Sequence, residues 1–111
     1  MSTTINEYKH CTLVTFEGRI DSNTVPAMEE SLKSITDAGQ FKIVLDMSKV
    51  TFVSSAGWWM LIETQKNCHR YNRGELVMSG LDDRIRKSLD LVGMGSYFKI
   101  YDDVVTAVAY F

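Results

Sequence analysis

Residues 43–62 read IVLDMSKVTFVSSAGWWMLI, and the architecture of the chain can be worked out from this stretch. It starts inside a short run, residues 41–46, whose nearly continuous apolar character is typical of a strand covered by helices. A loop is then expected to return Val50 and Phe52 to the core. The small residues at 54–57, Ser-Ser-Ala-Gly, follow directly and open a helix. This order predicts one unit of an alternating α/β fold.

Strands and helices alternate on either side of this stretch. The clearest helical pattern is Val25, Met28, Leu32 and Ile35, at spacings of three, four and three, which places all four on one face of a helix. Pro26 suits the first turn of that helix, where its missing N–H costs nothing. In full, we expect strands at residues 5–10, 11–17, 41–46, 75–79 and 97–101, and helices at residues 25–38, 55–71, 83–92 and 104–111.

The order of these elements predicts the fold class. Alternating strands and helices imply right-handed crossovers and a largely parallel sheet, and the initial strand pair adds an antiparallel edge. The chain has 111 residues, 45% of them hydrophobic, which suffices for one core and leaves no room for a second domain. We therefore expect one α/β domain over residues 1–111, with a mostly parallel, mixed sheet of four to five strands and about four helices.

Composition argues against several classes of partner. The formal net charge is −2 with scattered Lys and Arg, so no basic surface for nucleic acid is expected. No apolar run approaches the roughly 20 residues that span a bilayer, and residues 1–4 lack the features of a signal peptide. Cys11 and Cys68 stand outside any paired motif and are expected to be separate buried thiols. These features predict a protein of the reducing cytoplasm that binds neither nucleic acid nor membrane.

The start of the helix at residue 55 is the candidate functional site. The first N–H groups of a helix lack internal partners and carry partial positive charge from the helix dipole. A serine hydroxyl there can cap the helix, and a phosphate esterified to it is also tolerated. Ser54 and Ser55 therefore read either as a plain cap or as a regulatory site. Ala56 and Gly57 are small, which leaves room for the surface of a partner.

Two motifs in the stretch resemble the signature of the STAS family, named for sulphate transporters and anti-sigma-factor antagonists. Residues 45–48, Leu-Asp-Met-Ser, resemble its "LDLS" strand end. Residues 50–58 resemble the following V-x-F-hydrophobic-Asp-Ser-Ser/Ala-Gly-Leu. Gly-Arg-Ile-Asp at 18–21 matches the G-x-(I/L)-D before the first helix, and residues 91–93 and 98–102 match the late helix end and the last strand. The resemblance covers essentially the whole chain.

By its length the chain resembles the bacterial anti-sigma-factor antagonists, and this resemblance implies a switch. The unphosphorylated antagonist binds an anti-sigma factor that is also a serine kinase. Phosphorylation at the helix start separates the two proteins, and a PP2C-type phosphatase reverses it. By position the acceptor is Ser55, with Ser54 as the alternative. Asp21 and Asp46, expected at strand ends on the same rim, add to the repulsion that a phosphate causes.

The sequence departs from the family pattern at two places. Ser54 replaces the acid before the acceptor, and Trp58-Trp59 replaces Leu-Gly. Trp58 falls on the inward side of the helix. Trp59 lies about 100° further round, where it is either an exposed interface anchor or a ring lying flat on its own helix. The expected partner-binding residues are Asp21, Asp46, Ser54, Ala56, Gly57 and Trp59.

An enzymatic function is not expected. His10 and His69 have no Cys or His at metal spacing, and the sequence contains no Gly-rich phosphate loop. His69 is roughly 20 Å along the helix from Ser55, too far to act as its base. Neither a cofactor nor a metal is predicted.

Two further interpretations remain open. In the first, the chain is a STAS scaffold whose binding does not depend on phosphorylation. In the second, it is a STAS module that senses a small ligand or nucleotide. The ligand pocket of the second interpretation is expected at the carboxyl ends of the strands near Ser55.

Overall fold

A five-stranded sheet with the order β1-β2-β3-β4-β5 forms the centre of the computed structural model, which describes residues 2–70 and 74–111. β1 runs antiparallel to β2, whereas the other three pairs are parallel. The strands are β1 (Ser2–Glu7), β2 (Thr12–Ile20), β3 (Lys42–Val53), β4 (Glu75–Ser79) and β5 (Lys99–Tyr101). The helices are α1 (Val25–Asp37), α2 (Ser55–His69), α3 (Asp83–Leu91) and α4 (Val104–Ala109), with a 3-10 turn at Gly95–Tyr97. The predicted α/β class and mixed sheet are confirmed.

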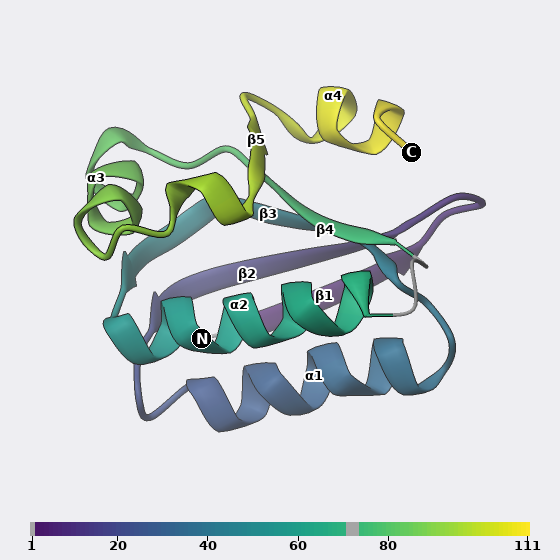
Figure 1. Ribbon diagram of the computed structural model, residues 1–111, viewed down its shortest axis with the longest axis horizontal. Coiled ribbons are helices and arrows are strands. Elements are labelled where there is room, and N and C mark those ends of the chain that lie inside the picture. Colours follow the sequence, from purple (N-terminus) through teal and green to yellow (C-terminus); the bar gives the residue numbers. More distant parts are fainter. Residues whose placement is uncertain (1, 71–73) are drawn as a thin grey trace.

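Each face of the sheet has its own core, because side chains of a strand alternate between the two faces. The larger core joins residues such as Phe16 and Leu45 to α1, α2 and α3. The smaller core lies under α4, where Ala107 packs with Leu13 and Val44. Figure 1 shows α1 and α2 side by side across one face and α4 on the other. The start of α2 therefore packs against the larger core.

β2 and β3 are longer than the sequence suggested. The predicted ends at residues 17 and 46 are wrong, since the two strands stay paired as far as Ile20 and Val53. Gly18, with a φ of 105°, allows β2 to continue through a conformation that other residues rarely adopt. The expected return of Phe52 to the core is also wrong. Phe52 lies on the outward side of β3 and stays 39% exposed.

The remaining boundaries differ by a few residues. β1 ends at Glu7 because a turn follows, in which the Tyr8 N–H donates to the carbonyl of Cys11 (2.8 Å). α2 is described as far as His69, and the predicted helix end at Tyr71 lies outside the described residues. No helix among the described residues is long and apolar enough to cross a membrane.

The two cysteines are buried free thiols, as predicted. Cys68 belongs to the larger core and Cys11 to the smaller one, so the sheet lies between them. Burial raises the pKa of Cys68 to about 12 and also raises the pKa of Cys11. Both therefore stay protonated and act as small apolar residues.

Gln65 is a buried polar residue that ties α2 to the sheet. Its side chain is 1% exposed, and its Nε2 donates to the carbonyls of Leu76 (2.9 Å) and Tyr97 (2.7 Å). Its Oε1 accepts from the Leu76 N–H at 2.7 Å. Pairing of β5 with β4 begins only at Val77, so the amide of Gln65 takes the place of a strand beside Leu76.

Candidate functional site at the start of α2

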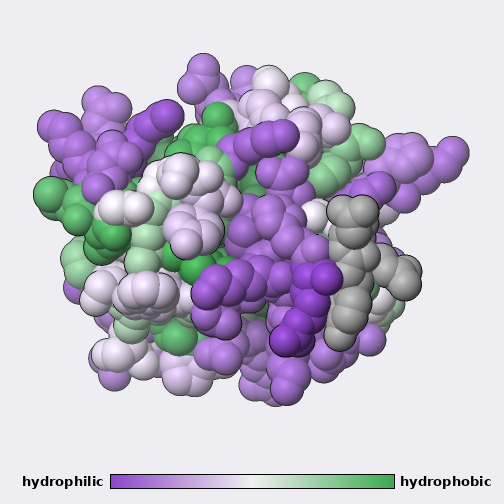
Figure 2. Space-filling view, viewed as in Figure 1, coloured by the Kyte–Doolittle hydropathy of each residue, from purple (hydrophilic) through white to green (hydrophobic). Residues whose placement is uncertain are grey.

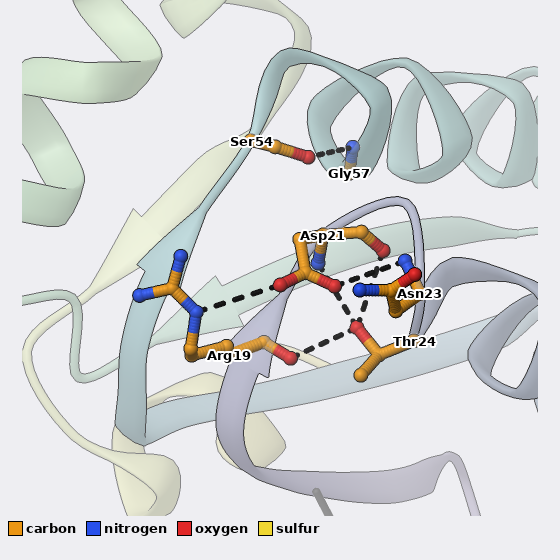
Figure 3. Close-up of polar contacts among 6 residues, drawn as sticks. All are labelled: Arg19, Asp21, Asn23, Thr24, Ser54 and Gly57. Atoms are coloured by element: carbon orange, nitrogen blue, oxygen red, sulfur yellow. Dashed lines mark hydrogen bonds and ion pairs between the residues drawn. The ribbon is translucent and has the colours of Figure 1, made fainter.

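The start of α2 is fixed to the end of β2 by a backbone hydrogen bond. The Ser54 N–H donates to the carbonyl of Ile20 at 2.8 Å. Ser54 is half-buried and extended, and its Oγ accepts from the Gly57 N–H at 3.2 Å (Figure 3). Ser54 is therefore the N-cap, and its hydroxyl satisfies one of the free N–H groups of the helix.

Ser55 is the first residue of α2 and is exposed. The capping bond at this helix end is made by Ser54, so the hydroxyl of Ser55 takes no part in it. The adjacent serines thus have separate surroundings. Sequence alone could not separate them, because either serine suits a helix start.

Ala56 and Gly57 differ in the same way. Ala56 is exposed, and its part in binding a partner stays a prediction. Gly57 is buried, and a Cβ there would lie 2.7 Å from Cγ2 of Ile20 and 3.0 Å from Cγ1 of Val53. The prediction that Gly57 leaves room for a partner is wrong. Its missing side chain instead lets α2 pack closely against the ends of β2 and β3.

Asp21 lies at the end of β2, directly after the residue that contacts Ser54. Its carboxylate accepts from the Asn23 N–H (3.0 Å) and pairs with Nε of Arg19 (3.4 Å), as Figure 3 shows. Desolvation alone raises the pKa of Asp21, but the hydrogen bonds from Asn23 and Arg19 outweigh it and hold the pKa below its usual value. Asp21 is therefore charged at neutral pH, on the rim where the sequence predicted it.

Asp46 does not share this rim. It lies within β3, paired with Thr15 and Ser79, and it accepts from the N–H (3.0 Å) and Oγ (2.7 Å) of Ser48. β3 then continues to Val53, which puts Asp46 roughly 20 Å from the start of α2. The prediction that Asp46 and Asp21 act together is wrong, because the segment after Asp46 is a strand rather than a loop.

The two tryptophans of α2 have different surroundings: the predicted burial of Trp58 is confirmed, and Trp59, whose exposure the sequence left open, is exposed. Trp58 is fully buried, and its Nε1 donates to Oγ of Ser88 at 3.0 Å. Ser88 in turn donates to the carbonyl of Val53 at 3.3 Å, so α3 braces the turn before the site. Trp59 is 54% exposed. Sequence reasoning missed Ser88, since its role depends on the position of α3.

A shallow groove of about 210 Å³ adjoins this turn. Phe52 lines it from β3 and Arg84 and Ile85 line it from α3. The guanidinium of Arg19 lies 4.3 Å from the centre of the Phe52 ring. The groove thus combines the exposed Phe52 ring with the Arg84 side chain, and Arg19 lies against the same ring. Nothing in the sequence marks it, because it depends on the unforeseen extension of β3.

The described residues contain no cluster of three or more His, Cys, Asp or Glu able to hold a metal ion. His69 ends α2, about 20 Å of helical rise from Ser55. The start of α2 thus offers a hydroxyl, a charged carboxylate and apolar surface, which suit recognition of a protein.

Comparisons with known proteins agree with this reading. A family model described as the STAS domain matches residues 2–107. An anti-sigma-B factor antagonist of Staphylococcus aureus is 30% identical over 77 residues, 69% of this chain and 70% of that protein. An anti-sigma factor antagonist from Mycobacterium paratuberculosis has a solved structure with a TM-score of 0.88 at 22% identity, over 98% of this chain and 92% of that one. The Bacillus cell fate determinant SpoIIAA in its phosphorylated form gives 0.75 at 12% identity, over 98% of both chains.

The two solved structures share the fold described above. The family match extends over nearly the whole chain, and it confirms the resemblance seen at residues 45–48 and 50–58. The anti-sigma factor antagonists named above are regulatory proteins rather than enzymes. The chain belongs to the STAS domain family, and the relatives it resembles within that family are anti-sigma factor antagonists.

Proposed function

We propose that the chain is an anti-sigma factor antagonist whose binding is switched off by phosphorylation of Ser55. The observation that carries this proposal is the separation of the two serines. Ser54 holds the helix cap, whereas Ser55 is exposed beside it. A kinase can therefore modify Ser55 without breaking the capping bond. A relative of the same fold, SpoIIAA, is known in a phosphorylated form.

A phosphate on Ser55 changes the rim without unfolding the protein. The group carries nearly two negative charges, and the nearby Asp21 carboxylate is already ionised. A partner docked over this rim has to desolvate the phosphate, and this desolvation costs free energy. The free N–H groups of the first turn of α2 tolerate the phosphate, so the fold is expected to stay intact.

The partner surface combines Ser55 with the exposed Ala56, Trp59 and Phe52. Figure 2 shows apolar and weakly polar residues at the start of α2, whereas the outer surface of α3 and the far end of α2 are hydrophilic. An exposed tryptophan near such a site suits an interface anchor. The partner in this proposal is an anti-sigma factor with serine kinase activity, and a PP2C-type phosphatase resets the switch. The chain then acts in the cytoplasm, where sigma factors engage RNA polymerase.

Affinity-tagged variants expressed in the natural host test this function. Ser55→Ala is expected to retain the anti-sigma factor in all growth conditions, because no phosphate forms. Ser55→Asp is expected to lose it at least tenfold, since a permanent negative charge stands at the interface. The captured kinase is identified by its ATP-dependent phosphorylation of the wild-type chain, and it is quantified by mass spectrometry.

Ser54→Asp is the matched control, because it places the same charge one residue earlier, and aspartate also caps helices. It is expected to bind better than Ser55→Asp. Equal capture of the kinase by the Ser55→Ala and Ser55→Asp variants would contradict the switch and favour a scaffold that does not depend on phosphorylation.

A further inference from the structure

Arg19 lies near the site, and its contacts there leave most of its hydrogen-bond donors free to bind a further group. Its guanidinium is 4.3 Å from the centre of the Phe52 ring, within the range of a cation–π contact. Its Nε pairs with Asp21 at 3.4 Å, and its side chain is 61% exposed. A guanidinium has five N–H donors, so the four on the Nη atoms lie outside the contact with Asp21.

The backbone brings Arg19 close to Ser55. Arg19 and Phe52 are cross-strand partners in the extended part of β2 and β3. The next residue of β2, Ile20, accepts the hydrogen bond of Ser54 at 2.8 Å. The Cα atom of Arg19 is about 3.8 Å from that of Ile20, and the Cα atom of Ser55 is about 3.8 Å from that of Ser54. Their Cα atoms are thus on the order of 10 Å apart, a gap that an arginine and a phosphoserine together can close.

We propose that the Nη groups of Arg19 bind the phosphate on Ser55 while its Nε stays with Asp21. This inference rests on the proposed function, because it concerns the phosphorylated form. A guanidinium is suited to the task, since its planar fork donates to two phosphate oxygens at once. It also separates the new phosphate from the carboxylate of Asp21. Arg19 is thus a positioning residue of the switch that stabilises the released state within the chain itself.

The bound arginine has a measurable consequence for the phosphate. A nearby cation favours the dianionic form, so it lowers the second pKa of the phosphoserine. Phosphoserine is installed at position 55 by genetic encoding in the wild type, Arg19→Gln, Arg19→Lys and Arg84→Gln. The phosphate is then titrated by ³¹P NMR at low salt. Arg84 is the matched control, because it lines the groove but pairs only weakly with Asp82, at 4.0 Å.

The pKa of the phosphate is expected to be higher in Arg19→Gln than in the wild type by about 0.5. Arg84→Gln is expected to match the wild type, and Arg19→Lys to fall between, because lysine keeps the charge and loses the fork. An unchanged phosphate pKa in Arg19→Gln, or an equal rise in Arg84→Gln, would overturn the assignment. Translation rather than a kinase supplies the phosphate, so this result is independent of whether the host phosphorylates Ser55.

Discussion

Ser54 and Ser55 are adjacent and have identical side chains, yet their surroundings differ. The backbone of Ser54 is extended, which lets its Oγ reach back to the Gly57 N–H. Ser55 is already helical and exposed. The sequence predicted that a serine here caps a helix or serves as a regulatory site. The structure assigns the cap to Ser54, whose Oγ accepts from the Gly57 N–H, and the bond from its own N–H to Ile20 ties it to the end of β2.

Ser54→Ala is expected to lower the free energy of unfolding by about 1 kcal/mol, because the first turn of α2 loses its cap. Ser55→Ala is the matched control and is expected to change stability by less than about 0.5 kcal/mol. Urea denaturation followed by tryptophan fluorescence measures both. An equal loss in the two variants would contradict the separation of cap and acceptor.

At the scale of elements, the extension of β3 is the feature that sequence reasoning could not supply. Its pairing with β2 has two irregularities, and at each of them β3 contains one residue more than β2. Buried residues therefore come at Met47, Val50 and Val53, every third position. A strand is recognised in a sequence by apolar residues at every second position. The bulges change this spacing in β3, so its second half does not read as a strand. The extension carries Asp46 away from the site and brings Phe52 to it.

α2 shows a second feature of this kind in Gln65, whose amide replaces a missing strand partner of Leu76. Gln65→Met keeps the volume but leaves the buried N–H and C=O of Leu76 and the C=O of Tyr97 without their partners. This variant is expected to lower the free energy of unfolding by about 2–4 kcal/mol. Asn67→Met, an exposed change on the same helix, controls for the added methionine. A loss below about 0.5 kcal/mol for Gln65→Met, measured by urea denaturation, would show that the amide is not a structural tie.

At the scale of the whole molecule, the order of elements was predictable because apolar periodicity, a short continuous apolar run or capping residues mark each one. The mixed sheet and four helices follow from that order. The contacts that hold the end of α4 against β4 and β5 were not predictable. Tyr110 donates to Glu75 (2.6 Å) and accepts from Lys99 (2.6 Å), a contact among residues far apart in the sequence. α4 thereby closes the smaller core on the face opposite α1 and α2, and the start of α2 stays open.

The central claim is that the open end of α2 bears a phosphorylation switch at Ser55. The most direct test isolates the chain from its natural host, with phosphatase inhibitors and in several growth conditions, and maps its phosphosites by mass spectrometry. We predict phosphate on Ser55 and an unmodified Ser54. Phosphate on Ser54 would contradict the assignment of the two serines, and a chain without phosphate in every condition would contradict the switch itself.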